Sequence, residues 1–204
     1  MTEEFLIPAK NIELEEEIKH SRFISFMFHC PSADVMKAEL GRIKLEFPGA
    51  SHYCYAFVAG APTNLIDMGS SDDGEPSGSA GRPMLACLQG ANIGELGVIV
   101  VRYFGGTKLG VGGLVRAYSS GVKKLIPQLE TCLKTLRYSA NIVCDYGQLN
   151  DIEYVINQCE GIITDKQFSA TVTVTFELAK AQQSKFNQLL ATQTQGAMQV
   201  KFTA

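Results

Sequence analysis

The stretch GELGVIVVRYFGGTKLGVGGLVRAY, residues 94–118, decides the fold of the first half of the chain. It opens with a run of β-branched and aromatic residues that predicts a buried strand over 94–104. Five glycines and two cations then fall within the twelve residues from Arg102 to Gly113. Apolar residues at helical spacing follow and predict a helix over 114–129. The segment therefore predicts a strand, a glycine-rich turn and a helix in succession.

The residues before this segment predict further short strands and helices. Ser32 is a suitable N-cap for one helix, and Pro83 can start another. The elements that we expect are two strands around a turn at 11–29, a helix at 32–46, a strand at 52–60 and a helix at 84–91.

After Pro127 the sequence predicts a new series of strands and helices, and therefore a second domain. The order of its elements is βαββαβ, the ferredoxin-like motif. We therefore expect an α+β protein with two domains, residues 1–133 and 134–204. The elements of the second are strands at 135–145, 161–165, 169–178 and 197–203, with helices at 148–159 and 180–192.

The composition is that of a globular protein. The chain has 204 residues, of which 46% are hydrophobic and 19% charged, with a net charge of −3 that gives no general attraction to nucleic acid. Its six cysteines form no C-x-x-C pair, so no structural zinc is expected. No apolar run reaches the length of a signal peptide core or a membrane span. We expect a soluble cytoplasmic protein without a membrane partner.

The glycine-rich turn has the composition of an anion site. Glycines let backbone N–H groups approach a ligand, and the following helix adds its positive N-terminal end. No glycine there is followed directly by lysine, and Val115 stands where G-x-G-x-x-G needs its third glycine. Both standard nucleotide motifs are therefore disfavoured. Two interpretations stay open: a site for another anion, and a tight turn whose glycines serve only the backbone.

The polar stretch 70–83 predicts a long loop, and loops of this length inside compact domains are usually functional. It carries three carboxylates in four residues, Asp72, Asp73 and Glu75. They could bind a cation such as Mg²⁺, although the spacing is not that of an EF-hand. They also suit turn and capping interactions, or could orient the basic residues of the glycine-rich turn. We favour the structural and orienting roles and assign no metal ligand.

His52 and Cys54 share one face of the strand at 52–60, because positions two apart in a strand point the same way. Such a pair could form a Cys–His nucleophile. Nothing else in the sequence supports that chemistry, and packed or hydrogen-bonded strand positions are commoner. We assign no catalytic residue.

Charge is distributed unevenly along the chain. Between Gly97 and Arg137 the only acid is Glu130, whereas residues 1–20 are rich in glutamate. A local basic segment predicts contact with a polyanion such as RNA, and nearby aromatic rings could stack on bases. The alternative is an ordinary solvated helix face. The aromatic candidates are Tyr103, Phe104 and Tyr118, and the cations are Arg102, Lys108, Arg116, Lys123, Lys124, Lys134 and Arg137.

Four segments together resemble the IMPACT family, specifically its bacterial YigZ-like branch. They are IKHSRFI (18–24), HYCYAFVAG (52–60), SDDGEPSGSAGRPML (71–85) and VVRYFGGTKLGVGGLVRAY (100–118). The last two are long and specific, and the resemblance covers essentially the whole chain. It implies an N-terminal domain like domain 2 of ribosomal protein S5, with helices on one face of a sheet, and a ferredoxin-like C-terminal domain. That pair resembles the last two domains of translocating elongation factors.

The resemblance also implies which residues share a surface. Eukaryotic members regulate translation by binding an activator of a stress kinase, but they carry an additional N-terminal domain, so that role is not carried over. We expect the SDDGE loop and the glycine-rich turn to form one ligand or nucleic-acid surface. The residues predicted for it are Arg22, His52, Asp72, Asp73, Glu75, Arg102, Gly105, Gly106, Lys108, Gly110, Gly113 and Arg116.

The leading hypothesis is a non-enzymatic, translation-associated protein that needs no cofactor. It would bind RNA, the ribosome or a protein partner, without specificity for a DNA sequence. The first alternative is a Mg²⁺-dependent enzyme acting on a phosphorylated small molecule, because S5-like folds also carry glycine-rich phosphate loops in small-molecule kinases. The second is a protein-interaction module. The sequence does not specify the oligomeric state.

Overall fold

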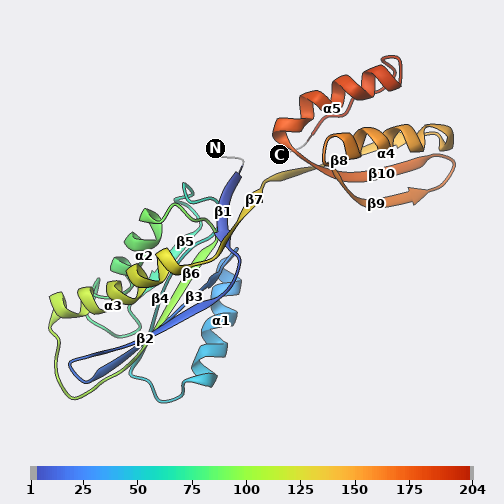
Figure 1. Cartoon of the computed structure of the whole chain (residues 1–204). Helices are drawn as coiled ribbons and strands as arrows, with labels where there is room; N and C mark the ends of the chain where they lie inside the picture. Colours follow the sequence, from blue (N-terminus) through green and yellow to red (C-terminus); the bar gives the residue numbers. More distant parts are fainter. Residues whose placement is uncertain (1–3, 203–204) are drawn as a thin grey trace. The chain divides into compact units, whose positions relative to one another are not determined.

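The structure, a computed structural model, describes residues 4–202. Its contacts divide the chain into two compact units between Lys134 and Thr135 (Figure 1). Each unit combines helices and strands around a hydrophobic core of its own, which confirms the predicted α+β class. None of the helices within this range is long and apolar enough to span a membrane.

A five-stranded antiparallel sheet lies at the centre of the first unit. Lys19 and His20, between its first two strands, both have positive φ, as a two-residue hairpin turn requires. The middle strand is buried along nearly its whole length, as the apolar run 94–104 predicts. In sheet order the strands are β2 (Ile12–Ile18), β3 (Ser21–His29), β6 (Leu96–Tyr103), β4 (His52–Val58) and β5 (Met68–Ser71).

Helices cover both faces of this sheet (Figure 1). Val98 and Val100 of β6 pack with α2 (Gly81–Gly90) and α3 (Val111–Leu125). Ile99 and Val101 pack on the other face with α1 (Ala33–Glu46). The expectation of helices on one face only is wrong. Consecutive residues of β3, β4 and β6 are apolar, so both faces of the sheet must be removed from water.

The predicted start of α1 is confirmed, because the Ser32 hydroxyl accepts the Val35 N–H at 3.3 Å. The other two helices begin earlier than predicted, α2 at Gly81 instead of 84 and α3 at Val111 instead of 114. The last glycines of the predicted turn are therefore helical. The predicted loop 70–83 shrinks to residues 72–80, since its ends belong to β5 and α2.

A two-stranded sheet, which the sequence analysis does not predict, closes the first unit. β1 (Glu4–Pro8) pairs with β7 (Thr131–Thr135), which follows the short 3-10 helix η1 (Ile126–Gln128). Next to it, the Ala9 N–H donates to the Glu130 carbonyl at 2.8 Å. Lys134 binds the buried Glu95 carboxylate, which His29 also contacts. These contacts fix the end of the first unit.

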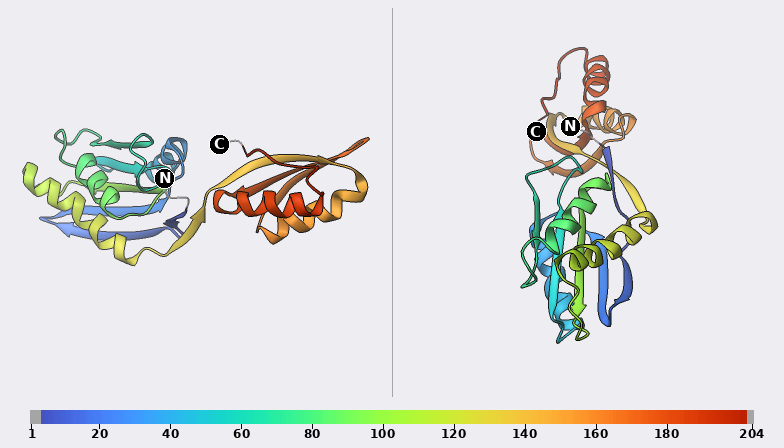
Figure 2. Two further views of the ribbon diagram at one scale, coloured as in Figure 1. Left: turned by 90° about the horizontal axis from the view of Figure 1, so that it is seen from above. Right: turned by 90° about the vertical axis from the view of Figure 1, so that its left-hand side faces the viewer.

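The second unit consists of a three-stranded antiparallel sheet and two helices, which share one hydrophobic core (Figure 2). The strand order β8-β10-β9 places the third strand of the unit between the first two, as in a ferredoxin-like fold. The elements are β8 (Arg137–Cys144), η2 (Tyr146–Gln148), α4 (Leu149–Gln158), β9 (Ile162–Phe168), β10 (Val172–Ala179) and α5 (Lys180–Gln193).

The predicted last strand at 197–203 does not form over residues 197–202, which are irregular. Residue 203 lies outside the described residues. Val200 is still buried in the core. The Asn187 side chain of α5 donates to the Val200 carbonyl at 3.1 Å and accepts its N–H at 3.0 Å. One side chain thus satisfies the backbone groups that a neighbouring strand would otherwise satisfy.

Replacing Asn187 by alanine should destabilise the second unit by about 1–3 kcal/mol, because it leaves both Val200 backbone groups without partners. The Val200 amide should also exchange its hydrogen faster. Urea denaturation followed by circular dichroism and amide exchange by NMR measure the two effects. Asn141→Ala, at an exposed position of β8, is the control and should change neither. Unchanged exchange at Val200 in N187A would contradict this role of Asn187.

Candidate functional site

A buried ion pair stands at the centre of the predicted site. Arg102, near the end of β6, is 5% exposed, and Glu75, from the loop 72–80, is 8% exposed. Arg102 Nη1 donates to Glu75 Oε1 at 2.5 Å, and the Tyr118 hydroxyl of α3 donates to the same oxygen at 2.7 Å. His52 Nε2 of β4 lies 3.8 Å from it. One carboxylate oxygen therefore joins two strands, a loop and a helix, which is the orienting role proposed for this loop.

The Arg102 guanidinium lies against two aromatic rings. Its Cζ is 5.4 Å from the ring centre of Phe23 and 5.5 Å from that of Phe104. Such a position suits arginine, whose delocalised charge is weakly hydrated and stacks on rings. The Nε of Arg102 is buried and has no hydrogen-bond partner among residues 4–202. The site therefore retains one unused donor.

Asp72 organises the start of α2. Its carboxylate accepts the backbone N–H groups of Gly78 (2.8 Å), Ala80 (2.9 Å) and Gly81 (2.8 Å). Burial alone would raise the pKa of Asp72, but these three hydrogen bonds outweigh burial and hold its pKa below the ordinary value. This capping is why α2 begins at Gly81 and not at the position that Pro83 predicts.

Asp73 serves the neighbouring strand. Its Oδ2 accepts the Tyr53 N–H at 2.7 Å, and its carbonyl oxygen lies 2.8 Å from His52 Nδ1. The three carboxylates of the loop, Asp72, Asp73 and Glu75, therefore all accept hydrogen bonds from protein donors. Across residues 4–202, no group of three or more His, Cys, Asp or Glu side chains is arranged to hold a metal ion.

His52 and Cys54 point to the same face of β4, as predicted, but Cys54 has a structural role. Its Sγ donates to the Asp72 carbonyl at 3.0 Å, and burial raises the pKa of its thiol to about 12. The thiolate is the nucleophilic form of cysteine, so this thiol is inert near neutral pH. Burial also raises the pKa of Tyr118 above its ordinary value, and its hydroxyl remains a donor to Glu75.

The glycine-rich loop lies directly against the turn between β2 and β3. A Cβ atom at Gly105 would lie 1.9 Å from the His20 carbonyl oxygen, so only glycine fits there. The Gly105 N–H donates to the Ser21 hydroxyl at 3.2 Å. Gly106 and Gly110 have φ angles of 82° and 73°, which favour glycine. The glycines thus do serve backbone geometry, and this close packing positions the residues that follow.

A hollow of about 420 Å³ opens between this loop and the buried ion pair. Its polar lining comes from His52, Glu75, Arg102 and Lys108. The exposed ring of Phe104 and the start of α3 complete it. Four predicted site residues and Gly110 therefore meet at one place, with Asp72 and Asp73 holding the loop behind them.

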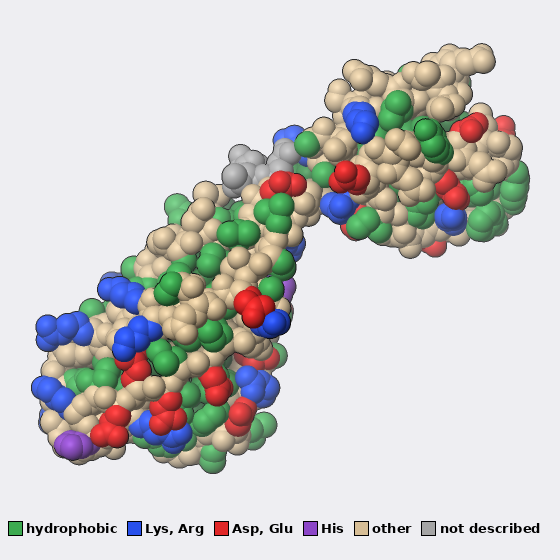
Figure 3. Space-filling model, viewed as in Figure 1, with side chains coloured by type: hydrophobic (Ala, Val, Ile, Leu, Met, Phe, Trp, Pro, Cys, Tyr) green, Lys and Arg blue, Asp and Glu red, His purple; other side chains and the backbone are tan. Residues whose placement is uncertain are grey.

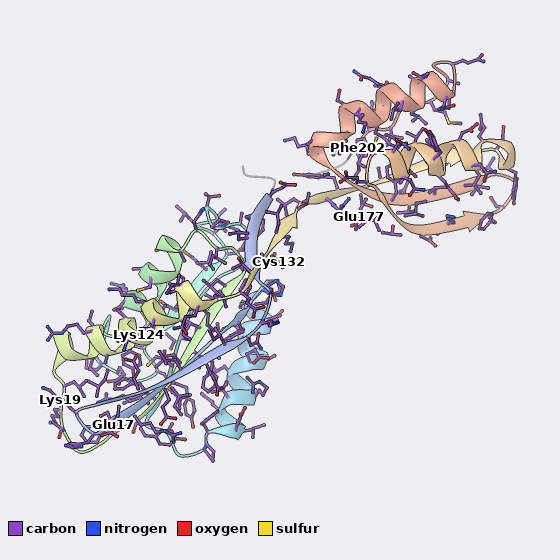
Figure 4. The ribbon with its side chains drawn as sticks, viewed as in Figure 1. Glu17, Lys19, Lys124, Cys132, Glu177 and Phe202 are labelled. Carbon is purple, nitrogen blue, oxygen red and sulfur yellow. The ribbon has the colours of Figure 1, made fainter. Side chains whose placement is uncertain are left out.

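Arg116 lies on the other side of the glycine-rich loop. It lines a second hollow of about 260 Å³ together with Gly113, Leu109 and Lys19. Figure 4 labels Lys19 at the turn between β2 and β3, and Figure 3 shows Lys and Arg side chains gathered over α3 in the same region. The sequence analysis misses Lys19, although it stands in the predicted turn and in the segment IKHSRFI.

Three cations lie around this loop. Within the described range, no salt bridge or side-chain hydrogen bond involves Lys19, Lys108 or Arg116. Other cations of the predicted basic segment are occupied: Lys124 pairs with Glu16 at 2.5 Å, Lys134 binds Glu95, and Arg137 donates to the Glu160 carbonyl. Lys123, near the other end of α3, has no ion-pair partner in the described part of the chain. We call Lys19, Lys108 and Arg116 the loop cations.

Arg22 does not contribute to this surface. It pairs across β3 and β6 with Tyr103, so it points to the opposite face of the sheet from Arg102. There it forms a two-pronged ion pair with Glu15, with Nε–Oε1 and Nη2–Oε2 distances of 2.6 and 2.8 Å. The expectation that Arg22 adds charge beside Arg102 is therefore wrong.

Two of the three predicted stacking rings are also placed elsewhere. Tyr118 is fully buried, and Tyr103 lies on the α1 face, where its hydroxyl donates to the Pro48 carbonyl at 3.2 Å. Phe104 alone of the three is at the hollow, and it is 49% exposed. Of the three predicted stacking rings, Phe104 is therefore the one that a ligand in this hollow can contact.

The fold and site define a class of two-domain α+β proteins, with an S5 domain 2-like unit that carries the glycine-rich loop and a ferredoxin-like unit. Family models agree with this division. The Impact N-terminal domain matches residues 19–126, and a domain of unknown function, DUF1949, matches residues 142–197. The chain belongs to the IMPACT family.

Curated relatives match over nearly the whole chain. The IMPACT family member YigZ of Escherichia coli K12 is 43% identical over 97% of both chains. An IMPACT family member of Haemophilus influenzae is 39% identical over 97% of this chain and 96% of its own, and YvyE of Bacillus subtilis 30% over 93% and 86%. A crystal structure described as that of a hypothetical protein has a TM-score of 0.80 and 41% identity, and the match covers 100% of this chain and 98% of that one.

Replacing Glu75 by glutamine should destabilise the first unit by about 3–5 kcal/mol, because the buried Arg102 loses its counter-charge. The double variant E75Q/R102M should recover part of that loss, since neither charge is then buried alone. Urea denaturation followed by circular dichroism measures the free energy of unfolding of E75Q, R102M and the double variant. If the loss of stability in the double variant equals the sum of the losses in E75Q and R102M, the two residues do not act as a pair.

Replacing Asp72 by asparagine should destabilise the first unit most at neutral pH. Because the folded-state pKa of Asp72 is lowered, its stabilisation is complete above the unfolded-state value of about 4 and is lost as the pH falls through the folded-state pKa. The stability gap between wild type and D72N should therefore narrow as the pH drops below about 4. Urea denaturation at pH 7 and at several acidic pH values measures the gap. A constant gap would contradict the assigned ionised cap.

Proposed function

We propose that this protein is a translation-associated RNA-binding protein of the cytoplasm, and that it contacts RNA phosphates through the loop cations. The observation that carries the proposal is the position of Lys19, Lys108 and Arg116 on both sides of a glycine-rich loop, without acidic partners in the described range. The exposed ring of Phe104 beside Lys108 offers a surface on which a base can stack.

Local charge supports this proposal better than net charge does. The chain as a whole carries a net charge of −3. Ion pairs neutralise part of the negative charge of β2, since Glu16 pairs with Lys124 and Glu15 with Arg22. The loop cations stay free to displace counterions from a phosphate backbone. The resemblance of the two units to the last two domains of translocating elongation factors supports a role in translation as an analogy of fold.

The Mg²⁺-dependent enzyme has weaker support from the geometry. Its metal would need the carboxylates of the SDDGE loop, and each of these already accepts hydrogen bonds from protein donors. Glu75 in addition neutralises Arg102. A cation at Glu75 would compete with the buried ion pair, and one at Asp72 with the cap of α2.

The double variant Lys108→Ala/Arg116→Ala should bind single-stranded RNA more weakly and with a flatter dependence on salt. The slope of log K against log salt is negative, and each lost phosphate contact reduces its magnitude by about 0.7, so two lost contacts reduce it by about 1.4. Fluorescence anisotropy with a labelled oligonucleotide at several salt concentrations measures affinity and slope.

Lys37→Ala/Lys44→Ala is the matched control, because it removes the same charge from α1 on the other face of the sheet. It should leave the slope unchanged. Equal RNA affinity in K108A/R116A and wild type would overturn the proposal. Capture of a protein partner that survives ribonuclease treatment, without RNA binding, would favour the interaction module.

A further inference from the structure

We propose that the 420 Å³ hollow is a socket for one phosphomonoester group, such as a nucleic-acid end or a mononucleotide carries. The socket shares Lys108 with the loop cations, whereas Lys19 and Arg116 line the second hollow. Its assignment to an RNA terminus rests on the proposed function, whereas binding of the phosphate group itself does not.

The first set of donors is the start of α3. This helix of 15 residues begins after Gly110, which has no side chain to cap it, and its first turn contains no acidic residue. The Leu114 N–H bonds to the Gly110 carbonyl at 2.9 Å. The three N–H groups before it, on residues 111–113, therefore have no acceptor within the helix. Gly110, Val111 and Leu114 line the hollow, so the first of these donors, on Val111, and the positive end of the helix lie at its wall.

A second, independent observation is the unused donor of Arg102. This side chain is buried and lines the same hollow, and its Nε has no hydrogen-bond partner in the range 4–202. Buried donors are nearly always paired in folded proteins. A phosphate oxygen in the hollow is an acceptor of the charge that this donor requires.

The charges around the hollow favour a dianion. Glu75 also lines it, but its carboxylate is matched by the Arg102 guanidinium, so this pair adds no net charge. Lys108 and the helix N-terminus then leave the hollow positive. His52 also lines the hollow; its Nδ1 donates to the Asp73 carbonyl, and its Nε2 lies 3.8 Å from Glu75 Oε1.

Shape favours a terminal group over an internal phosphodiester. The volume is at the lower end of the range for small-ligand pockets. Side chains of Leu109, Val111 and Leu114 form apolar walls around the polar base. A terminal phosphate can enter such a hollow with its sugar or base against Phe104, whereas an internal phosphate would bring chain on both sides.

Gly112→Asp tests the socket by placing a negative charge in the first turn of α3, next to Val111 at the wall of the hollow. A Cβ atom at Gly112 meets nothing within 4 Å, and an acidic residue in the first turn stabilises a helix, so the variant should fold. Gly41→Asp is the matched control, since position 41 of α1 also has open space and the change in charge is the same. Each full-length protein is titrated with inorganic phosphate by isothermal calorimetry and NMR, then with RNA oligonucleotides that carry a 5′-phosphate or a 5′-hydroxyl.

Wild type and G41D should bind inorganic phosphate, with shifts of the amide signals of residues 111–113, and G112D should bind it about 10-fold more weakly or not at all. Wild type should prefer 5′-phosphorylated RNA, and G112D should lose that preference. Equal phosphate binding by wild type and G112D would overturn the socket.

The same experiment separates the socket from the proposed function. RNA binding that ignores the terminal phosphate and is not displaced by inorganic phosphate would overturn the socket but leave the proposed function standing. Binding of inorganic phosphate that is lost in G112D, without RNA binding at low salt, would support the socket and overturn the proposed function.

Discussion

The buried pair of Arg102 and Glu75 is the interaction on which the first unit depends. Two charges taken out of water are tolerated only when their geometry and hydrogen bonds compensate for lost hydration. Here Tyr118 supplies a further donor to the carboxylate, and two aromatic rings contact the guanidinium. The pair joins the end of the central strand to the loop 72–80 and to α3. The hollow beside it therefore has walls whose relative positions are fixed by charge as well as by apolar packing.

The positive surface around the glycine-rich loop depends on which other cations are already paired with acidic side chains. Acidic side chains of β2 occupy Arg22 and Lys124, and Glu95 occupies Lys134. Among residues 4–202 the loop cations have no such partners, so a chain that is acidic overall presents a local positive surface. Within the SDDGE loop, Glu75 is neutralised by Arg102, whereas Asp72 and Asp73 keep their charge and bind backbone N–H groups. A feature that looks like a metal site in the sequence thus serves to hold an anion-facing surface in place.

Much of this arrangement could be predicted because its causes are local. The apolar run 94–104 and the glycines after it specify a buried strand and a tight turn, and Ser32 specifies a helix start. The errors arise where distant residues act. Asp72 caps α2 from nine residues before Gly81, and Asn187 replaces a strand partner for Val200. The predicted position of Arg22 is wrong because its side chain lies on the α1 face. Its register against Tyr103 sets that face, and this register depends on the pairing of strands far apart in sequence.

The contact of Gly105 with the turn between β2 and β3 has a consequence for how such sequences can diverge. The turn and the loop are 84 positions apart, yet the Gly105 N–H reaches Ser21 and its Cα leaves no room for a side chain beside His20. An insertion in the hairpin turn would displace the loop, and one in the loop would break its contact with the turn. The turn and the loop can therefore change length only together. Paired insertions or deletions in related chains would mark those whose hollow has a different shape.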